Sequence, residues 1–319
     1  MYGPVLSWRL GRSLGIDIVP PPKTCTFDCV YCQLGRTVYK VSAPVEARVP
    51  KEDVLRDVKR ALDLLDPGSV DHVTFSGSGE PTLNPELGGI IEGLKRLTDK
   101  PVAVLTNSSL LDKEEVRRSL TKADLVVAKL DAPSQPLLEA INRPAGGILH
   151  ENIVEGLMKL RSEMSGELAL QMMFLKSRGG GVTNTGEEAV EALVRLTEKS
   201  EPDEVQVNTP TRPPSERFVL ALEPDRVEAI AERFRASLKH ARIVSRYERK
   251  TESTPRRLGH QDIEMEVLAL IERRPCRLED IARSLDLPSE VVTEHLNQLV
   301  ERGKVLAVKH GGKLYYRTQ

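Results

Sequence analysis

Short apolar runs alternate along the first three quarters of the chain with longer stretches whose apolar residues recur at helical spacing. The stretch 51–65 is typical of the longer kind, because Val54, Val58 and Leu62 follow one another at intervals of four. The short runs are almost continuously apolar, which indicates strands of a parallel sheet covered by helices. We predict such strands at 14–19, 72–77, 102–108, 125–132, 167–176 and 204–209. Six strand–helix units are fewer than the eight of a closed barrel, so we expect an α/β fold with an open partial barrel or a doubly wound sheet.

A polar and charged stretch interrupts this pattern near the end of the chain. We therefore predict a first domain at 1–247, a linker at 248–261 and a second domain at 262–319. The second domain contains three helical patterns followed by a segment that turns at Gly311–Gly312, which predicts a hairpin. Three helices and a hairpin are typical of a winged helix-turn-helix domain.

Composition and charge narrow the classes to which the protein can belong. The 319 residues carry a formal net charge of −1 and are 39% hydrophobic, which is usual for a globular protein and gives no overall bias toward nucleic acid. We find neither a secretory signal pattern nor an apolar run long enough for a membrane span. We therefore expect a cytoplasmic protein with no membrane partner, whose clustered cysteines serve as metal ligands or catalysts rather than in disulfides.

Three of the four cysteines, Cys25, Cys29 and Cys32, lie within eight positions after the first predicted strand. Thiolates are soft ligands that suit iron–sulfur clusters or zinc. A structural zinc site would need a remote fourth ligand, because Cys276 lies in the second domain and His72 lies beyond a helix. A [4Fe–4S] cluster on this loop would instead leave one iron without a protein ligand and open to a small molecule. The loop therefore predicts either an open cluster or a zinc site completed from elsewhere.

A second motif, formed by Gly77, Ser78, Gly79 and Glu80, ends the next predicted strand. Glycines let the backbone approach a ligand closely, and a glutamate carboxylate accepts a hydrogen bond from an ammonium group. Taken alone, the motif is equally consistent with a tight surface turn.

The two motifs together resemble the signature of the radical S-adenosylmethionine (SAM) superfamily. The resemblance implies that the three cysteines hold a [4Fe–4S] cluster and that SAM chelates the remaining iron. It also implies that Tyr31 lies beside the adenine and that the residues from Gly77 to Glu80 bind the methionyl amino group. Ser78 departs from the usual pattern because it separates the two glycines. The implied fold is a partial (β/α)6 barrel with parallel strands.

The same resemblance implies an enzyme activity. An external one-electron reductant drives the cleavage of SAM, and the resulting 5′-deoxyadenosyl radical abstracts hydrogen from a substrate. The segments 3–25, 129–132 and 208–214 are further similar to iron–sulfur oxidoreductases related to tRNA wyosine synthesis enzymes, and this similarity covers about 1–247. The wyosine enzymes use additional cysteines for a second cluster, and only Cys276 is left over here, so the reaction itself is not identified.

Polar residues follow several predicted strands, and the carboxyl ends of parallel strands form the active face of a barrel. By resemblance, Asn107 and Ser108 contact the ribose of SAM. Lys129 and Asp131 are further candidates for the SAM site, and Asp131 is also a candidate general base. The other polar residues at strand ends are Thr106, Gln171, Asn208 and Thr209. Turns and helix caps use the same residue types, so each position also has an ordinary structural interpretation.

The polar–proline loops at 142–144 and 208–214 are candidates for gating or recognising a substrate, or are ordinary loops. In the second domain, the third helix presents Glu290, Glu294 and Glu301 opposite its apolar face, and acidic side chains would repel DNA phosphates. We therefore expect this domain to recognise a peptide or protein substrate first, RNA second and duplex DNA least.

Two other functions stay open from the sequence. One is a metal-stabilised winged-helix regulator that binds nucleic acid, and the other is an enzyme that installs a glycyl radical in a partner. Cys276 is either a hydrogen donor in the reaction or a small residue of the second domain's core, and its apolar neighbours favour the core.

Overall fold

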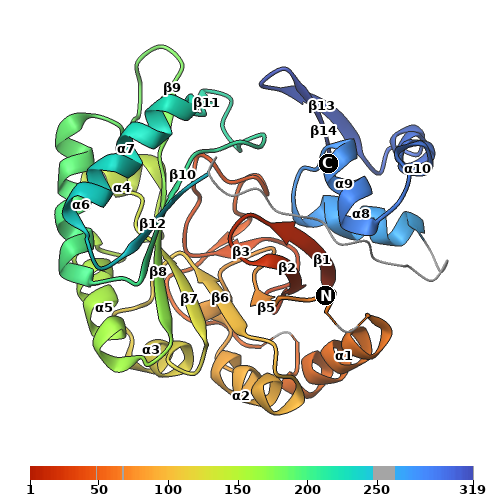
Figure 1. Ribbon diagram of the computed structural model, residues 1–319, viewed down its shortest axis with the longest axis horizontal. Helices are drawn as coiled ribbons and strands as arrows, with labels where there is room; N and C mark the ends of the chain where they lie inside the picture. Colours follow the sequence, from red (N-terminus) through yellow and green to blue (C-terminus); the bar gives the residue numbers. More distant parts are fainter. Residues whose placement is uncertain (48, 67, 247–262, 319) are drawn as a thin grey trace.

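A curled sheet of eight strands forms an α/β half-barrel in the computed structural model, which describes residues 1–47, 49–66, 68–246 and 263–318 (Figure 1). The strand order is β1-β2-β5-β6-β7-β8-β10-β12. Every neighbouring pair from β2 to β12 is parallel, and β1 alone pairs antiparallel, with β2. The strands are β1 (Tyr2–Ser7), β2 (Gly11–Ile16), β5 (His72–Phe75), β6 (Val102–Thr106), β7 (Leu125–Lys129), β8 (Glu167–Met173), β10 (Glu204–Asn208) and β12 (Arg242–Ser245).

The six predicted strands correspond to β2, β5, β6, β7, β8 and β10, so the mostly parallel partial barrel is confirmed. The strands β1 and β12 were not predicted, and they are the two edge strands of the sheet. The Gly3–Pro4 pair interrupts the pattern of β1, and β12 is only four residues long. Edge strands are buried less completely than central ones and therefore leave a weaker apolar signal.

Helices cover the outer face of the sheet (Figure 1). They are α1 (Lys51–Leu64), α2 (Leu87–Leu97), α3 (Glu114–Leu120), α4 (Gln135–Ile141), α5 (His150–Glu163), α6 (Glu187–Ser200) and α7 (Pro224–Ser237). The predicted apolar face of α1 is confirmed by burial of Val54 and Val58. The core lies between helices and sheet, where for example the rings of Phe174 and Phe234 meet edge to face with centroids 6.4 Å apart. This packing leaves the carboxyl ends of the strands to carry polar residues.

Five short elements lie in the loops around the carboxyl ends of the strands. They are β3 (Thr24–Cys25), β4 (Tyr39–Lys40), the 3-10 helix η1 (Pro81–Leu83), β9 (Lys176–Ser177) and β11 (Val219–Leu220). β3 pairs with β4, and β9 pairs with β11.

The C-terminal unit has the predicted order of three helices and a hairpin: α8 (Ile263–Arg273), α9 (Leu278–Leu285), α10 (Ser289–Glu301), β13 (Leu306–His310) and β14 (Lys313–Arg317). The predicted linker at 248–261 lies outside the described residues. Cys276 is 1% exposed in the core of this unit, as the interpretation of a small core residue predicts. None of the described helices combines the length and apolar character that crossing a bilayer requires.

The N-terminal strand connects the half-barrel to the C-terminal unit. β1 pairs with β2 in the sheet, yet Val5 of β1 is buried in the same hydrophobic cluster as Val267, Leu270 and Ile271 of α8. The side chain of Arg273, at the end of α8, also lies 3.5 Å from the carboxylate of Asp17. The two units therefore share a hydrophobic core and an ion pair.

Candidate functional site

The cysteine loop lies at the carboxyl edge of the sheet and is held there by two other loops. Cys25 ends β3, and Cys29 and Cys32 follow it. The backbone N–H of Val30 donates to the carbonyl of Ile141 at the end of α4, at 2.9 Å. The hydroxyl of Ser215 donates to the carbonyls of Cys29 and Val30 at 2.9 Å each. Segments far apart in sequence thus fix the loop that carries the three thiols.

Each of the three thiols accepts an N–H donor from a different part of the chain. The pairs are Lys23 Nζ to Cys32 Sγ at 3.1 Å, Asn107 Nδ2 to Cys25 Sγ at 3.5 Å and Asn142 Nδ2 to Cys29 Sγ at 3.4 Å. Donors of this kind favour sulfur that carries negative charge, whether as thiolate or as a metal ligand.

Burial opposes the effect of these donors, because it favours the neutral thiol over the charged thiolate. It raises the pKa of Cys25 to about 12, with a further contribution from the charge of Glu80, and it raises the pKa of Cys29 to about 11, with a further contribution from Cys32. A thiol with such a pKa is protonated at neutral pH unless a metal replaces the proton. Among the described residues no three His, Cys, Asp or Glu side chains converge on one metal ion. A cubane cluster does not require this convergence because each thiolate binds a different iron.

The motif from Gly77 to Glu80 packs directly against the cysteine loop. A Cβ atom on Gly79 would lie 2.0 Å from the carbonyl oxygen of Thr24, and one on Gly77 would lie 2.2 Å from Cγ of Asp17. Ser78 donates to Asp17 Oδ2 from its backbone N–H at 2.9 Å and from its hydroxyl at 2.8 Å. Both glycines are therefore needed for close contact with the protein's own Thr24 and Asp17, and the unusual Ser78 anchors the loop. The predicted approach of this backbone to a ligand stays a prediction.

Glu80 is 3% exposed and joins the ends of β5 and β6. Its Oε1 accepts hydrogen bonds from the backbone and hydroxyl of Thr82 and from the hydroxyl of Thr106, at 2.7 to 3.1 Å. Among the residues that the structure describes, only the backbone N–H of Asn107 donates to its Oε2, at 2.7 Å. Burial raises the pKa of Glu80, and these donors oppose the rise. Because a carboxylate oxygen has two lone pairs, Oε2 has room for one further donor.

The two predicted ribose contacts differ in their surroundings. Asn107 donates to Thr26 Oγ1 at 2.7 Å and lies beside Cys25. Ser108 is fully buried with a φ of 70°, and its hydroxyl has no hydrogen-bond partner among the described residues. A positive φ is uncommon for serine and is found where the surrounding structure imposes it.

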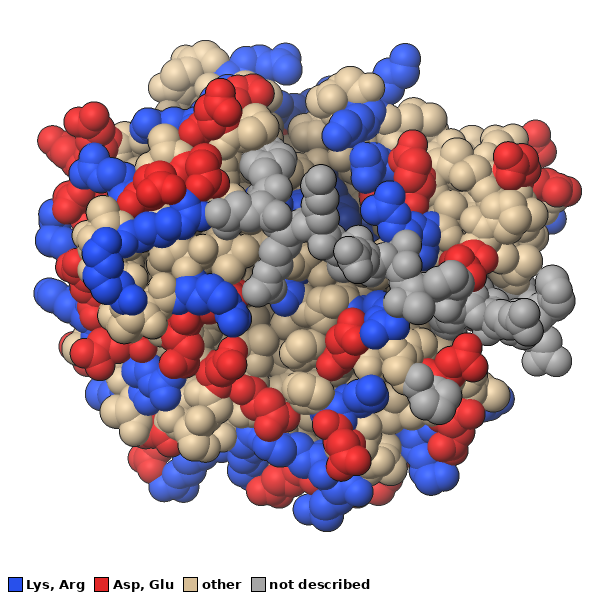
Figure 2. All heavy atoms as spheres, in the orientation of Figure 1, with Lys and Arg blue, Asp and Glu red and all other residues tan. Residues whose placement is uncertain are grey.

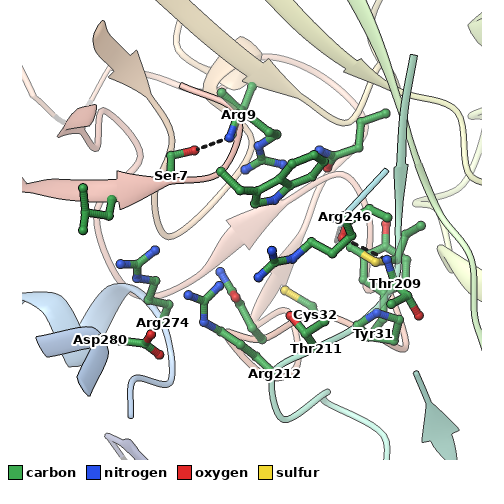
Figure 3. A pocket seen from close by; sticks show the side chains of 18 of the residues that line it. Ser7, Arg9, Tyr31, Cys32, Thr209, Thr211, Arg212, Arg246, Arg274 and Asp280 are labelled. Carbon is green, nitrogen blue, oxygen red and sulfur yellow. Dashed lines mark hydrogen bonds between the residues drawn. The ribbon is translucent and has the colours of Figure 1, made fainter. Parts of the chain in front are cut away.

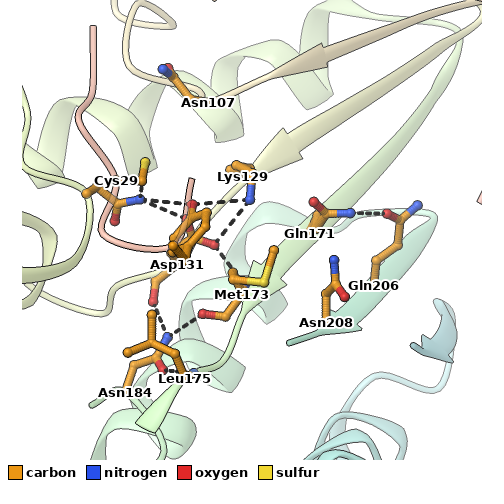
Figure 4. Close-up of polar contacts among 12 residues, drawn as sticks. Cys29, Asn107, Lys129, Asp131, Gln171, Met173, Leu175, Asn184, Gln206 and Asn208 are labelled. Carbon is orange, nitrogen blue, oxygen red and sulfur yellow. Dashed lines mark hydrogen bonds and ion pairs between the residues drawn. The ribbon is translucent and has the colours of Figure 1, made fainter. Parts of the chain in front are cut away.

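A polar network connects Tyr31 with Lys129 and Asp131. Figure 4 shows the side chains of Lys129 and Asp131 together with Cys29. The Tyr31 hydroxyl donates to Asp131 Oδ2 and accepts from Lys129 Nζ and from Asn142 Nδ2, each at 3.2 Å. The Lys129 ammonium also lies 4.8 Å from the centre of the Tyr31 ring. Burial and the charge of Asp131 hold the pKa of Tyr31 well above its usual range, so the phenol stays protonated. Asp131 Oδ1 accepts the backbone N–H of Met173 at 2.8 Å, so its carboxylate is fixed between β7 and β8.

The structure also shows site residues that were not singled out from the sequence. Asn142 was noticed only as part of a polar–proline loop, yet it joins Cys29 to Tyr31 and Asp131. Lys23 lies two residues before Cys25, and this position beside the cysteine motif was the available signal.

A cavity of about 1010 Å³ opens beside this network, between the half-barrel and the C-terminal unit (Figure 3). Tyr31, Cys32 and Lys129 line one side of it. The strand-end residues Gln171, Asn208 and Thr209 also line it. Most of the predicted SAM-site residues are therefore gathered around the cysteine loop, and the cavity leaves space for a second molecule beside them.

The sequence profile of the Radical SAM superfamily matches residues 19–178. A UPF0026 protein of Methanocaldococcus jannaschii is 32% identical over 320 residues, which cover 99% of this chain and 94% of that protein. A protein described as GTPase Obg from Brachyspira hyodysenteriae is 34% identical over 316 residues. The matched residues cover 99% of this chain and 45% of the Brachyspira protein, so this chain spans less than half of that protein's length. Among solved structures, the FeFe-hydrogenase maturase HydG from Carboxydothermus hydrogenoformans has the same fold, with a TM-score of 0.50, 12% identity and coverage of 82% of this chain and 56% of that one.

Proposed function

The chain belongs to the radical SAM superfamily and is a radical SAM enzyme, and from this premise we propose that Cys25, Cys29 and Cys32 hold a [4Fe–4S] cluster whose open iron binds SAM. One observation carries the proposal. Each of the three thiols of one loop faces an N–H donor, from Lys23, Asn107 or Asn142, beside a glycine motif and a large cavity. Donors to sulfur stabilise the negative charge of a cluster with thiolate ligands.

Residues around the loop are placed to bind the rest of SAM. The free lone pair of Glu80 Oε2 suits the methionyl ammonium, with Gly77, Ser78 and Gly79 supplying the adjacent backbone. We assign Asn107, Ser108, Lys129 and Asp131 to the same SAM site, and Tyr31 to the side of the adenine, as the motifs imply. Lys129 then provides a positive charge next to the cavity, and the fixed carboxylate of Asp131 provides a negative charge.

When bound, the cluster and SAM supply reductive cleavage that yields a 5′-deoxyadenosyl radical. One electron from an external reductant and one hydrogen atom from the substrate balance the conversion of SAM to methionine and 5′-deoxyadenosine. The protein's own contribution is to hold the substrate against Tyr31 and Cys32 in the cavity and to limit access of water and oxygen.

We propose further that the unit at 262–319 is a winged-helix domain, joined through 248–261 to the catalytic domain at 1–247, and that it helps to hold an RNA or polypeptide substrate. Its three helices and hairpin and its buried core support this interpretation. The exposed Glu290, Glu294 and Glu301 of α10 disfavour duplex DNA. The relationship to wyosine synthesis enzymes rests on sequence motifs and is part of this proposal.

The test compares two cysteine variants of the full chain purified without oxygen. We expect the wild type to be brown, to contain about four iron atoms and to form 5′-deoxyadenosine from SAM with dithionite. Cys29→Ala should lose the iron and the cleavage, whereas the matched Cys276→Ala should keep both because Cys276 lies in the core of the C-terminal unit. A wild type that holds one zinc and no iron, or a Cys29→Ala protein that keeps its cluster, would contradict the proposal.

A further inference from the structure

The cavity beside Tyr31 and Cys32 is strongly basic. Seven of its lining residues are basic: Arg9, Lys129, Arg212, Arg246, Arg274, Arg277 and Arg283. Among the described lining residues Asp280 is the one acid, and it already pairs with Arg277 at 2.8 Å. The visible surface does not share this bias, because acidic and basic side chains are interspersed over the face shown in Figure 2.

Two of these arginines form no ion pair at contact distance within the described part of the chain, although the charge of Asp280 acts on Arg212 from further away. No described carboxylate forms an ion pair with Arg212 or Arg274, and the Nε atoms of both are buried without a hydrogen-bond partner there. Arg212 comes from the loop after β10, and Arg274 directly follows the last residue of α8. Their guanidinium groups and that of Arg246 point into the same space in Figure 3. The two units of the protein thus bring positive charges together in one cavity.

Gathering these guanidinium groups has an electrostatic cost. Burial lowers the pKa of Arg212 to about 10, and the charge of Arg274 adds to this effect. Burial likewise lowers the pKa of Arg9 to about 10, with further contributions from Arg246 and Arg274. Groups that repel one another in a partly buried site are stabilised by an anion that several of them can contact at once, and guanidinium groups match phosphate in a bidentate manner.

An aromatic ring lies within the same cluster. Trp8 follows β1, and the guanidinium carbons of Arg9 and Arg246 lie 5.6 and 5.5 Å from its ring centre. Trp8 lines the cavity together with both arginines. Indole rings and guanidinium planes are the surfaces on which nucleic-acid bases stack.

We propose that this cavity binds a nucleoside phosphate, either a free nucleotide or one unit of an RNA strand, as the substrate of the enzyme. The phosphate lies among Arg212, Arg246 and Arg274, and the base lies toward Trp8. The single carboxylate of SAM does not account for seven basic residues. An acidic peptide would satisfy the charge and leave Trp8 without a function. The assignment as substrate rests on the proposed function, whereas the binding itself does not require it.

The test uses the fluorescence of Trp8, which is the single tryptophan of the chain. The full-length, anaerobically purified protein with saturating SAM is titrated with the four common 5′-ribonucleotides and with the matching nucleosides. The same titration is made with a 5′-phosphorylated RNA hexamer and with a hexaglutamate peptide. We expect the emission to change with nucleotides or RNA, and nucleosides to bind at least about tenfold more weakly, because charge-assisted contacts to phosphate would be missing. Comparing the nucleotides with the hexamer identifies which source of nucleoside phosphate is preferred.

Arginine variants locate the phosphate. Arg212→Gln and Arg274→Gln should each weaken binding at least about tenfold and reduce its dependence on salt. Arg283→Gln, on the exposed side of α9, should fold normally and weaken binding severalfold. Arg56→Gln on α1, away from the cavity, is the charge-matched control and should bind like the wild type.

Several results would overturn the proposal: equal binding of nucleosides and nucleotides, displacement of the nucleotide by SAM, preference for hexaglutamate, or no response to any nucleotide or RNA. Repeating the titration without SAM on Cys29→Ala separates this inference from the proposed function. Nucleotide binding by the iron-free Cys29→Ala protein would show that the binding site does not depend on the cluster. A wild type that holds no iron and still binds nucleotide would refute the cluster and leave the binding site intact.

Discussion

The position of Gly79 shows how a single missing methyl group shapes the site. Its backbone lies so close to Thr24 that the cysteine loop and the loop after β5 touch without any side chain between them. The backbone N–H of Glu80 donates to the same Thr24 carbonyl at 3.3 Å. The geometry of Cys25, one residue further on, therefore depends on this glycine.

Gly79→Ala should destabilise the iron-free protein by about 1–3 kcal/mol, because a Cβ 2.0 Å from the Thr24 oxygen forces the backbone to move. Displacement of the cysteine loop should also lower the iron content of the purified protein. Urea unfolding and iron analysis check both effects.

The matched control is Gly89→Ala within α2, where the nearest atom to the new Cβ would be Lys51 Cδ at 3.5 Å. The free energy of unfolding of this variant should be higher than that of the wild type by about 0.5–1 kcal/mol, because alanine loses less conformational freedom than glycine when a helix forms. Equal stability of the two variants would contradict the prediction that a Cβ atom at position 79 clashes with the Thr24 carbonyl oxygen.

At the scale of elements, the first turn of α9 couples helix stability to pH. The Arg277 backbone and side chain both donate to Asp280, at 2.8 to 3.2 Å. Burial alone would raise the pKa of Asp280, but the hydrogen bonds from Arg277 and the charge of Arg212 hold it at about 2. A carboxylate three residues into a helix also satisfies N–H groups that have no partner within the helix.

The Asp280 carboxyl has a lower pKa in the folded chain than the 3.8 of an unperturbed carboxyl, so its ionised form favours folding. The stabilisation, roughly 2 kcal/mol, is complete above about pH 5 and is lost as the pH falls through 4 toward 2. Asp280→Asn should therefore be less stable than the wild type at pH 7, and the difference should shrink as the pH is lowered from 5 to 3. Urea unfolding at each pH measures this difference, and a difference that does not depend on pH would exclude the carboxylate as its source.

The elements that the sequence pattern predicts correctly are those whose burial is local and regular. The six central strands and most helices have apolar residues at the expected spacing, whereas β1, β12 and the seven-residue α4 are short or lie at an edge. The cysteine and glycine motifs were readable because each is contiguous. The basic cavity could not be predicted from the sequence, because Arg9, Arg212 and Arg274 lie far apart in the chain and only the fold brings them together.

At the scale of the whole molecule, apolar packing, an ion pair and a hydrogen bond join the half-barrel to the C-terminal unit. Val5 of β1 packs in the C-terminal core, and Arg273 pairs with Asp17 beside the glycine motif. Tyr315 of β14 donates to the carbonyl of Thr211 in the loop after β10, at 2.8 Å. The C-terminal unit therefore touches an edge strand, the predicted SAM loop and the loop that carries Arg212.

Val5→Ala should lower the stability of the protein by about 1–3 kcal/mol by leaving a cavity in this shared core. Because β1 belongs to both units, native-state hydrogen exchange should show reduced protection in β2 and in α8 and α9 together. Loss of protection confined to β1 and β2 would show that the C-terminal unit does not rely on the strand.

The adjacency of Arg273 and Arg274 has a consequence for how two ligands would affect each other. Arg273 holds Asp17 and donates to the hydroxyl of Ser78 at 3.3 Å, while Arg274, the next residue, faces the cavity. A phosphate that drew Arg274 inward would also shift the neighbouring Arg273, whose side chain contacts Asp17 and Ser78 beside the glycine motif. Thermodynamic linkage then requires reciprocity: if the anion tightens SAM binding by some factor, SAM tightens anion binding by the same factor.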